Sequence, residues 1–90
     1  MHSTNAPIRV VLADDHEMVR HALARVLDDS GKVQIVAQAG SASETLAAIA
    51  RERPEVAVLD YSMPDQDAPS LIEHILELAS ELRILVLTVH

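Results

Sequence analysis

Three aspartates stand at the ends of two apolar segments, where they could bind a cation together. Asp60 directly follows the run Val56–Leu59, and a second run, Ile8–Ala13, ends in Asp14 and Asp15. If the two runs are neighbouring parallel strands, their carboxyl ends meet at one edge of a sheet. Clustered carboxylates repel one another, and a divalent cation that prefers oxygen ligands offsets this repulsion. The spacing therefore predicts a cation site, where an aspartate oxygen could also accept a phosphoryl group.

The elements that must position these acids alternate along the chain. Short apolar segments typical of buried strands are separated by amphipathic helical patterns. We expect strands over Ile8–Ala13, Val33–Ala39, Val56–Leu59 and Arg83–Thr88, and helices over Glu17–Asp29, between Ser41 and Pro54, and between Pro69 and Ala79. This alternation predicts an α/β fold with a parallel sheet.

Capping signals and apolar spacing support the predicted helices. Ser41 and Glu44 form a capping box, Gly31 stands in the favoured position past the end of the first helix, and Pro69 suits a first helical turn. Apolar residues recur at helical spacing in the first helix (Val19, Ala22, Leu23, Val26 and Leu27), and the second helix is expected to bury Leu46, Ala47, Ile49 and Ala50.

The composition limits the class of protein. Ninety residues fit one small domain, with residues 1–7 expected to be a disordered tail and residues 8–90 the domain. The net charge of −7 and the single aromatic residue argue against direct binding to nucleic acid. Without cysteine, signal peptide or membrane-length apolar stretch, the sequence is expected to be cytoplasmic and not attached to a membrane.

Three motifs, taken in order, resemble the receiver domain of two-component response regulators. They are Ile8–His16 (IRVVLADDH), Asp60–Pro64 (DYSMP) and Ile84–Thr88 (ILVLT). More narrowly, the chain is similar to the NarL/FixJ subfamily, whose receivers precede a LuxR-type helix-turn-helix. The resemblance implies a flavodoxin-like receiver fold, with a parallel sheet of strand order 2-1-3-4 and right-handed crossovers.

The resemblance also implies roles for individual residues. Asp60 would accept a phosphoryl group from a histidine kinase, and Thr88 would be the switch hydroxyl that hydrogen-bonds this group. Asp15 and Asp60 would ligate Mg²⁺ directly, Asp14 through water, and the backbone carbonyl of Ser62 would complete the site. The chain would be no enzyme beyond self-phosphorylation and self-dephosphorylation at Asp60, and it would control a DNA-binding output domain that this sequence does not contain.

The match covers only part of a receiver. Receivers usually continue with a further helix, a fifth strand ending in lysine and a last helix, so the chain resembles a C-terminally truncated receiver without the last strand and the last two helices. An exposed edge strand from Arg83 and an uncovered apolar face predict a homodimer. Ala68 stands where the family commonly has glycine, and a positive φ there would cost on the order of 1 kcal/mol.

Individual residues in these motifs also have ordinary structural interpretations. Asp14 and Asp15 could cap the first helix, because acids favour the positive end of the helix dipole. Asp65 and Asp67 are expected to be loop and cap residues. The histidines, including His16 beside the acid pair, are expected to face solvent or a helix surface.

Two other functions are compatible with the sequence. The first is a pseudo-receiver, a protein-interaction module that never carries phosphate. The second is a Mg²⁺-dependent phosphohydrolase of haloacid-dehalogenase type. The sequence favours this second class less, because that class has Asp-x-Asp after its first strand and this chain has Asp-Asp.

Overall fold

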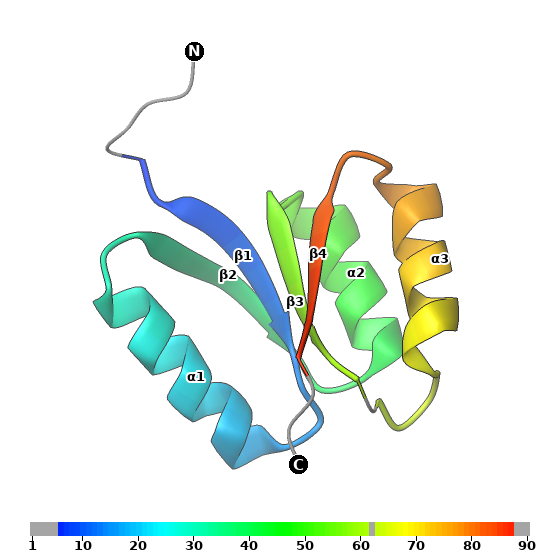
Figure 1. Cartoon of the computed structure of the whole chain (residues 1–90), viewed down its shortest axis with the longest axis horizontal. Coiled ribbons are helices and arrows are strands. Elements are labelled where there is room, and N and C mark those ends of the chain that lie inside the picture. Colours follow the sequence, from blue (N-terminus) through cyan, green and yellow to red (C-terminus); the bar gives the residue numbers. More distant parts are fainter. Residues whose placement is uncertain (1–5, 62, 88–90) are drawn as a thin grey trace.

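A four-stranded parallel sheet forms the centre of the molecule in a computed structural model that describes residues 6–61 and 63–87. The strands are β1 (Ile8–Ala13), β2 (Val33–Ala39), β3 (Val56–Asp60) and β4 (Arg83–Leu87), and the helices are α1 (Glu17–Asp29), α2 (Ala42–Glu52) and α3 (Ala68–Leu78). The sheet order is β2-β1-β3-β4, with α1 on one face and α2 and α3 on the other (Figure 1). The predicted α/β fold and strand order are confirmed.

Alternating side chains of the central strands form two cores. Val11 and Ala13 in β1 pack with Leu59 in β3 on the face that α2 and α3 cover. Leu12 and Val58 point to the opposite face, where they pack with residues of α1. Burial on both faces explains why Val10–Ala13 in β1 and Val56–Leu59 in β3 are apolar at every position, as expected for a parallel sheet between helices.

Local capping explains where the helices begin and end. The Ser41 hydroxyl accepts a hydrogen bond from the Glu44 backbone N–H at 3.2 Å, which is one half of the predicted capping box, while the Glu44 carboxylate accepts from the Gly40 N–H at 2.9 Å. Asp67 accepts a hydrogen bond from the Ser70 backbone N–H at 3.0 Å and starts α3, with Pro69 in its first turn. Past the end of α1, Gly31 has a φ of 75°, a conformation that glycine adopts without a Cβ clash.

In α1 and α2 the buried residues differ in part from the predicted stripes. In α2, Ile49 is buried as predicted and Leu46 is partly buried, but Ala47 and Ala50 are exposed, and Ala42, Thr45 and Ala48 are buried instead. The helix contacts β1, β2 and α3 together, so its buried face is turned toward all three. In α1 only Ala24 is buried, while Val19, Ala22 and Val26 are exposed. Among the described residues α1 is the sole helix on its side of the sheet. No second helix in this part of the chain covers its remaining surface, which is therefore exposed to solvent.

Ala68 does not adopt the strained conformation that a family glycine at this position suggested. It is the first residue of α3 and is buried, and the non-glycine residue with a positive φ in the described part of the chain is Arg53. Within residues 6–61 and 63–87, none of the helices has the length and apolar character needed to cross a membrane.

Candidate cation and phosphoryl site

The register of β1 and β3 places their acidic ends side by side. Ala13 in β1 is paired with Leu59 in β3. The next residues along the two chains are Asp14 and Asp60, so both lie at the carboxyl edge of the sheet. This edge is where ligands bind in open α/β sheets. Strand β3 reaches one residue further than predicted and ends at Asp60 itself.

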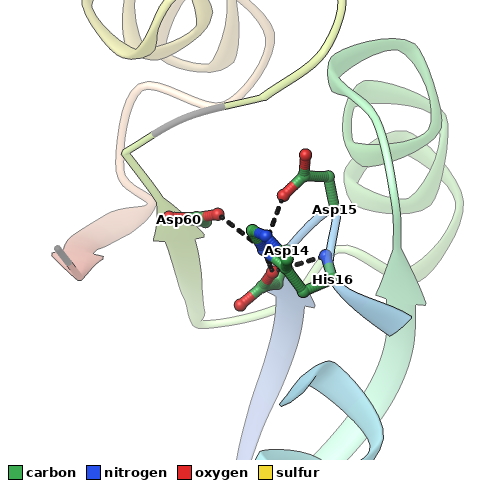
Figure 2. A group of neighbouring side chains, drawn as sticks. All are labelled: Asp14, Asp15, His16 and Asp60. Atoms are coloured by element: carbon green, nitrogen blue, oxygen red, sulfur yellow. Dashed lines mark hydrogen bonds and ion pairs between the residues drawn. The ribbon is translucent and has the colours of Figure 1, made fainter. Parts of the chain in front are cut away.

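Four side chains meet at this edge. Asp14, Asp15 and His16 come from the connection between β1 and α1, and Asp60 comes from β3 (Figure 2). One ligand atom from each of the four lies within 4.8 Å of the others. The Asp14 side chain is 7% exposed, Asp60 12% and Asp15 32%. The three predicted acids are thus brought together, and Asp15 is the most exposed of the three.

Backbone hydrogen bonds fix the direction of Asp14. Its N–H donates to the Ala39 carbonyl at 3.0 Å, and its own carbonyl accepts from the Arg20 guanidinium at 2.8 Å. The Asp14 carboxylate accepts the His16 backbone N–H at 2.7 Å. These three contacts hold the connection between β1 and α1 against β2. A Cβ at Gly40 would lie 3.0 Å from the Arg20 guanidinium, so the small residue there leaves room for this arrangement.

The donor set suits a small divalent cation. Carboxylate oxygens are the ligands that Mg²⁺ prefers, and Mg²⁺ usually keeps several waters, which an edge open to solvent can supply. Without a cation, three carboxylates this close repel one another. The residues present therefore fit Mg²⁺, with Asp14, Asp15 and Asp60 as the holding groups.

Two predicted site residues cannot be placed. Ser62, proposed to contribute a backbone carbonyl, and Thr88, proposed as the switch hydroxyl, lie outside the described residues. Their roles stay predictions. His16 is 69% exposed, as expected for a histidine that faces solvent, and its ring also belongs to the cluster. The sequence feature that could have indicated this membership is the position of His16 directly after Asp14 and Asp15.

Asp65 has a second structural role that the sequence did not reveal. Its carboxylate accepts the backbone N–H groups of Ala42 at 2.6 Å and Ser43 at 3.1 Å. With Ser41 capping Glu44, the first turn of α2 thus has its free N–H groups satisfied from two directions. The loop that follows Asp60 is thereby tied to the start of α2, which helps to fix the rim of the site.

The two hydrogen bonds to Asp65 predict a pH-dependent contribution to stability. They hold the pKa of Asp65 below its ordinary value of 3.8, with the Ala42 N–H as the largest cause. A pKa depressed by folding means that the stabilisation is present above the unfolded-state pKa and is lost as the pH falls through the folded-state pKa. Asp65→Ala should therefore lower the thermal unfolding midpoint by a few degrees near neutral pH, and its difference from the wild type should vanish in strong acid.

Asp29 offers a matched control for this prediction, because it is an exposed acid at the end of α1. Thermal unfolding followed by circular dichroism across the acidic range measures both variants. A difference between Asp65→Ala and the wild type that stayed constant with pH would contradict the charged hydrogen-bond role. A loss of the same size in Asp29→Ala would contradict it too.

Comparison with known proteins gives the same class as the fold and site. The model of the response regulator receiver domain family matches residues 10–90. The DNA-binding transcriptional activator DevR/DosR of Mycobacterium tuberculosis is 40% identical over 81 residues, which are 90% of this chain and 37% of that protein. The signal receiver domain of the response regulator NarL from M. tuberculosis has 35% identity and a TM-score of 0.81, covering 93% of this chain and 68% of that one. A LuxR-family response regulator from Aurantimonas has 28% identity and a TM-score of 0.88, covering 94% and 61%.

The parallel sheet of order 2-1-3-4, with acids gathered at its carboxyl edge, defines a flavodoxin-like receiver fold. The chain belongs to the response regulator receiver domain family of two-component signalling. Its relatives include LuxR-type transcriptional regulators, of which it spans well under two thirds of the length, 37% in the case of DevR/DosR.

Proposed function

We propose that this chain is the phospho-acceptor module of a two-component response regulator, with Asp60 as the residue that takes the phosphoryl group. The observation that carries the proposal is the convergence of Asp14, Asp15 and Asp60 at the carboxyl edge of the sheet. The Asp60 side chain is 12% exposed, so it is held by the fold and is still reachable from solvent. Membership of the receiver family supports the same role.

The proposed reaction needs little beyond positioning and charge. A carboxylate oxygen of Asp60 attacks the phosphorus of a phosphohistidine, the P–N bond breaks, and the released histidine nitrogen takes up a proton. The product is an acyl phosphate on Asp60. Asp14 and Asp15 would hold Mg²⁺ together with Asp60 and the backbone carbonyl of Ser62, and bound Mg²⁺ would offset the charge of the incoming group. Thr88 would donate its hydroxyl to a phosphoryl oxygen.

The partners in this proposal follow from the chemistry of the donor. A histidine kinase supplies the phosphoryl group, which places the reaction in the cytoplasm. The chain would be no enzyme apart from gaining and losing phosphate at Asp60. Control of a DNA-binding output domain belongs to the longer protein that the LuxR-type relatives represent.

Exposure to a phosphodonor tests the proposal directly. The purified chain is incubated with acetyl phosphate, with and without Mg²⁺, and the intact mass is measured. We expect one added phosphoryl group that needs Mg²⁺, that hydroxylamine removes, and that maps to the peptide containing Asp60. Absence of both phosphoryl transfer and any response to Mg²⁺ with beryllofluoride would instead favour a pseudo-receiver, and repeated turnover of a phosphate ester would favour a phosphohydrolase.

We also propose that two copies of this chain associate through the β4 side of the sheet. In the described sheet β4 is an edge strand, paired with β3 and with no strand beyond it. Leu85 in β4 is 54% exposed and lies next to Val58 of the α1-facing core. An open edge with an exposed apolar side chain favours pairing with another chain.

Leu85→Lys should weaken this association at least about tenfold, because a charged side chain on an edge strand opposes pairing. Sedimentation velocity over a range of micromolar concentrations measures the change. Leu76→Lys is the matched control, since Leu76 is 41% exposed and lies in α3, on the other side of the sheet. A wild type that stays monomeric across this range would contradict the dimer, and equal weakening by both variants would contradict the β4 interface.

A further inference from the structure

We propose that His16 adds an imidazole ligand to the acidic cluster, and that this ligand makes the cluster favour a transition-metal ion such as Zn²⁺ over Mg²⁺. This inference rests on the proposed function in one respect, because it takes the cluster to be a cation site. It concerns a residue to which the proposed phosphorylation chemistry gives no part. The new element is an imidazole nitrogen within a group of three carboxylates.

The His16 ring nitrogen lies close to all three acids at once (Figure 2). Its Nδ1 is 2.9 Å from Asp15 Oδ1, 3.3 Å from Asp14 Oδ1 and 3.9 Å from Asp60 Oδ2. Two ligands at about 2.1 Å from one metal ion are separated by about 3.4 Å in the tetrahedral geometry usual for Zn²⁺. The three separations lie within about 0.5 Å of this value. His16 Nδ1 therefore lies where a fourth ligand of a shared cation would lie.

The local backbone holds His16 in this position. His16 is the residue that precedes α1, and its side chain makes no capping hydrogen bond to the helix. Its backbone N–H donates to Asp14 Oδ1 at 2.7 Å, so the turn keeps the histidine against the acid pair. The imidazole is 69% exposed, which leaves it room to turn away when another cation is bound. The His16 side chain is therefore not used in helix capping, and its Nδ1 is directed at the carboxylates of Asp14 and Asp15.

The ligand types then separate two classes of cation. Mg²⁺ takes oxygen ligands, so the three carboxylates suffice for it and the imidazole adds little. Zn²⁺ and its neighbours in the first transition series bind imidazole nitrogen well, and a site of three carboxylates and one imidazole fits their smaller coordination number. We therefore expect His16 to raise the affinity for Zn²⁺ and to leave that for Mg²⁺ nearly unchanged. A Zn²⁺ ion held in this way would compete with Mg²⁺ for the same carboxylates.

Metal titrations of the full chain test the inference. Zn²⁺ and Mg²⁺ are titrated separately at neutral pH into the wild type and His16→Ala, with binding followed by calorimetry and by the thermal unfolding midpoint. We expect His16→Ala to weaken Zn²⁺ binding at least about tenfold and to change Mg²⁺ binding by less than about threefold. Cobalt(II) serves as a spectroscopic probe, because its visible absorption bands should change when the nitrogen ligand is removed.

His21 is the matched control, since it is a second exposed histidine and lies in α1, which begins directly after His16. His21→Ala should leave both affinities unchanged, and circular dichroism checks that each variant is folded. A Zn²⁺ affinity that is unchanged in His16→Ala, or that falls equally in His21→Ala, would overturn the inference. Asp60→Asn should weaken both metals. His16-dependent Zn²⁺ binding in a chain that acetyl phosphate cannot modify would support the inference while the proposed function fails.

Discussion

Asp60→Asn is expected to reduce phosphoryl transfer to this chain below detection. Asparagine has nearly the same size and keeps one side-chain oxygen, but its neutral amide is a poor nucleophile and cannot form the acyl phosphate. The variant also removes one of three neighbouring negative charges. In the absence of divalent cations it should therefore unfold at a slightly higher temperature than the wild type. Intact-mass measurement after treatment with acetyl phosphate and Mg²⁺ gives the first result, and thermal unfolding in a chelator gives the second.

Two controls separate loss of the acceptor from loss of the cation. Asp14→Asn keeps Asp60 and removes a predicted metal-holding group, so it should weaken Mg²⁺ binding and slow transfer without abolishing it. Asp29→Asn changes an exposed acid at the far end of α1 and should leave transfer unchanged. Phosphorylation of Asp60→Asn at the wild-type rate would show that another residue is the acceptor.

Leu59→Ala is expected to give the largest loss of stability. Leu59 is fully buried in the core between the sheet and the pair α2 and α3, directly before Asp60 in β3. Truncating a buried leucine removes apolar contacts and leaves a cavity, which costs about 2–5 kcal/mol. A loss of about 3 kcal/mol in a domain of this size corresponds to roughly 12–24 °C in the unfolding midpoint.

Leu85→Ala is the matched control, because it makes the same chemical change one strand away at a side chain that is 54% exposed. We expect it to cost less than about 1 kcal/mol. Urea unfolding of both variants at low protein concentration, where association contributes little, measures the difference. Equal losses would mean that the face carrying Leu85 is as well packed as the core around Leu59.

The helices and strands could be predicted from the sequence because the residues that start and end them act on near neighbours. Ser41 with Glu44, Gly31, and Pro69 after Asp67 act through hydrogen bonds and backbone preferences within a few residues, and the structure places helix ends at each of them. The alternation of apolar strands with amphipathic helices also predicted the sheet. The predicted stripe of α2 was partly wrong, since Thr45 is buried and Ala47 is exposed. Helical periodicity identifies an apolar face but does not say which neighbours the helix will contact.

The chain by itself determined the order of the elements, their caps and the presence of acids at the ends of two strands, because all of these depend on neighbouring residues. Tertiary structure alone decided which distant groups meet. The pairing of Ala13 with Leu59 brings Asp14 beside Asp60, and the loop after β3 carries Asp65 to the start of α2. The direction of the His16 ring toward all three carboxylates was decided there as well. These contacts join residues separated by up to 46 positions, and their geometry depends on strand register and packing, which short-range sequence patterns do not specify.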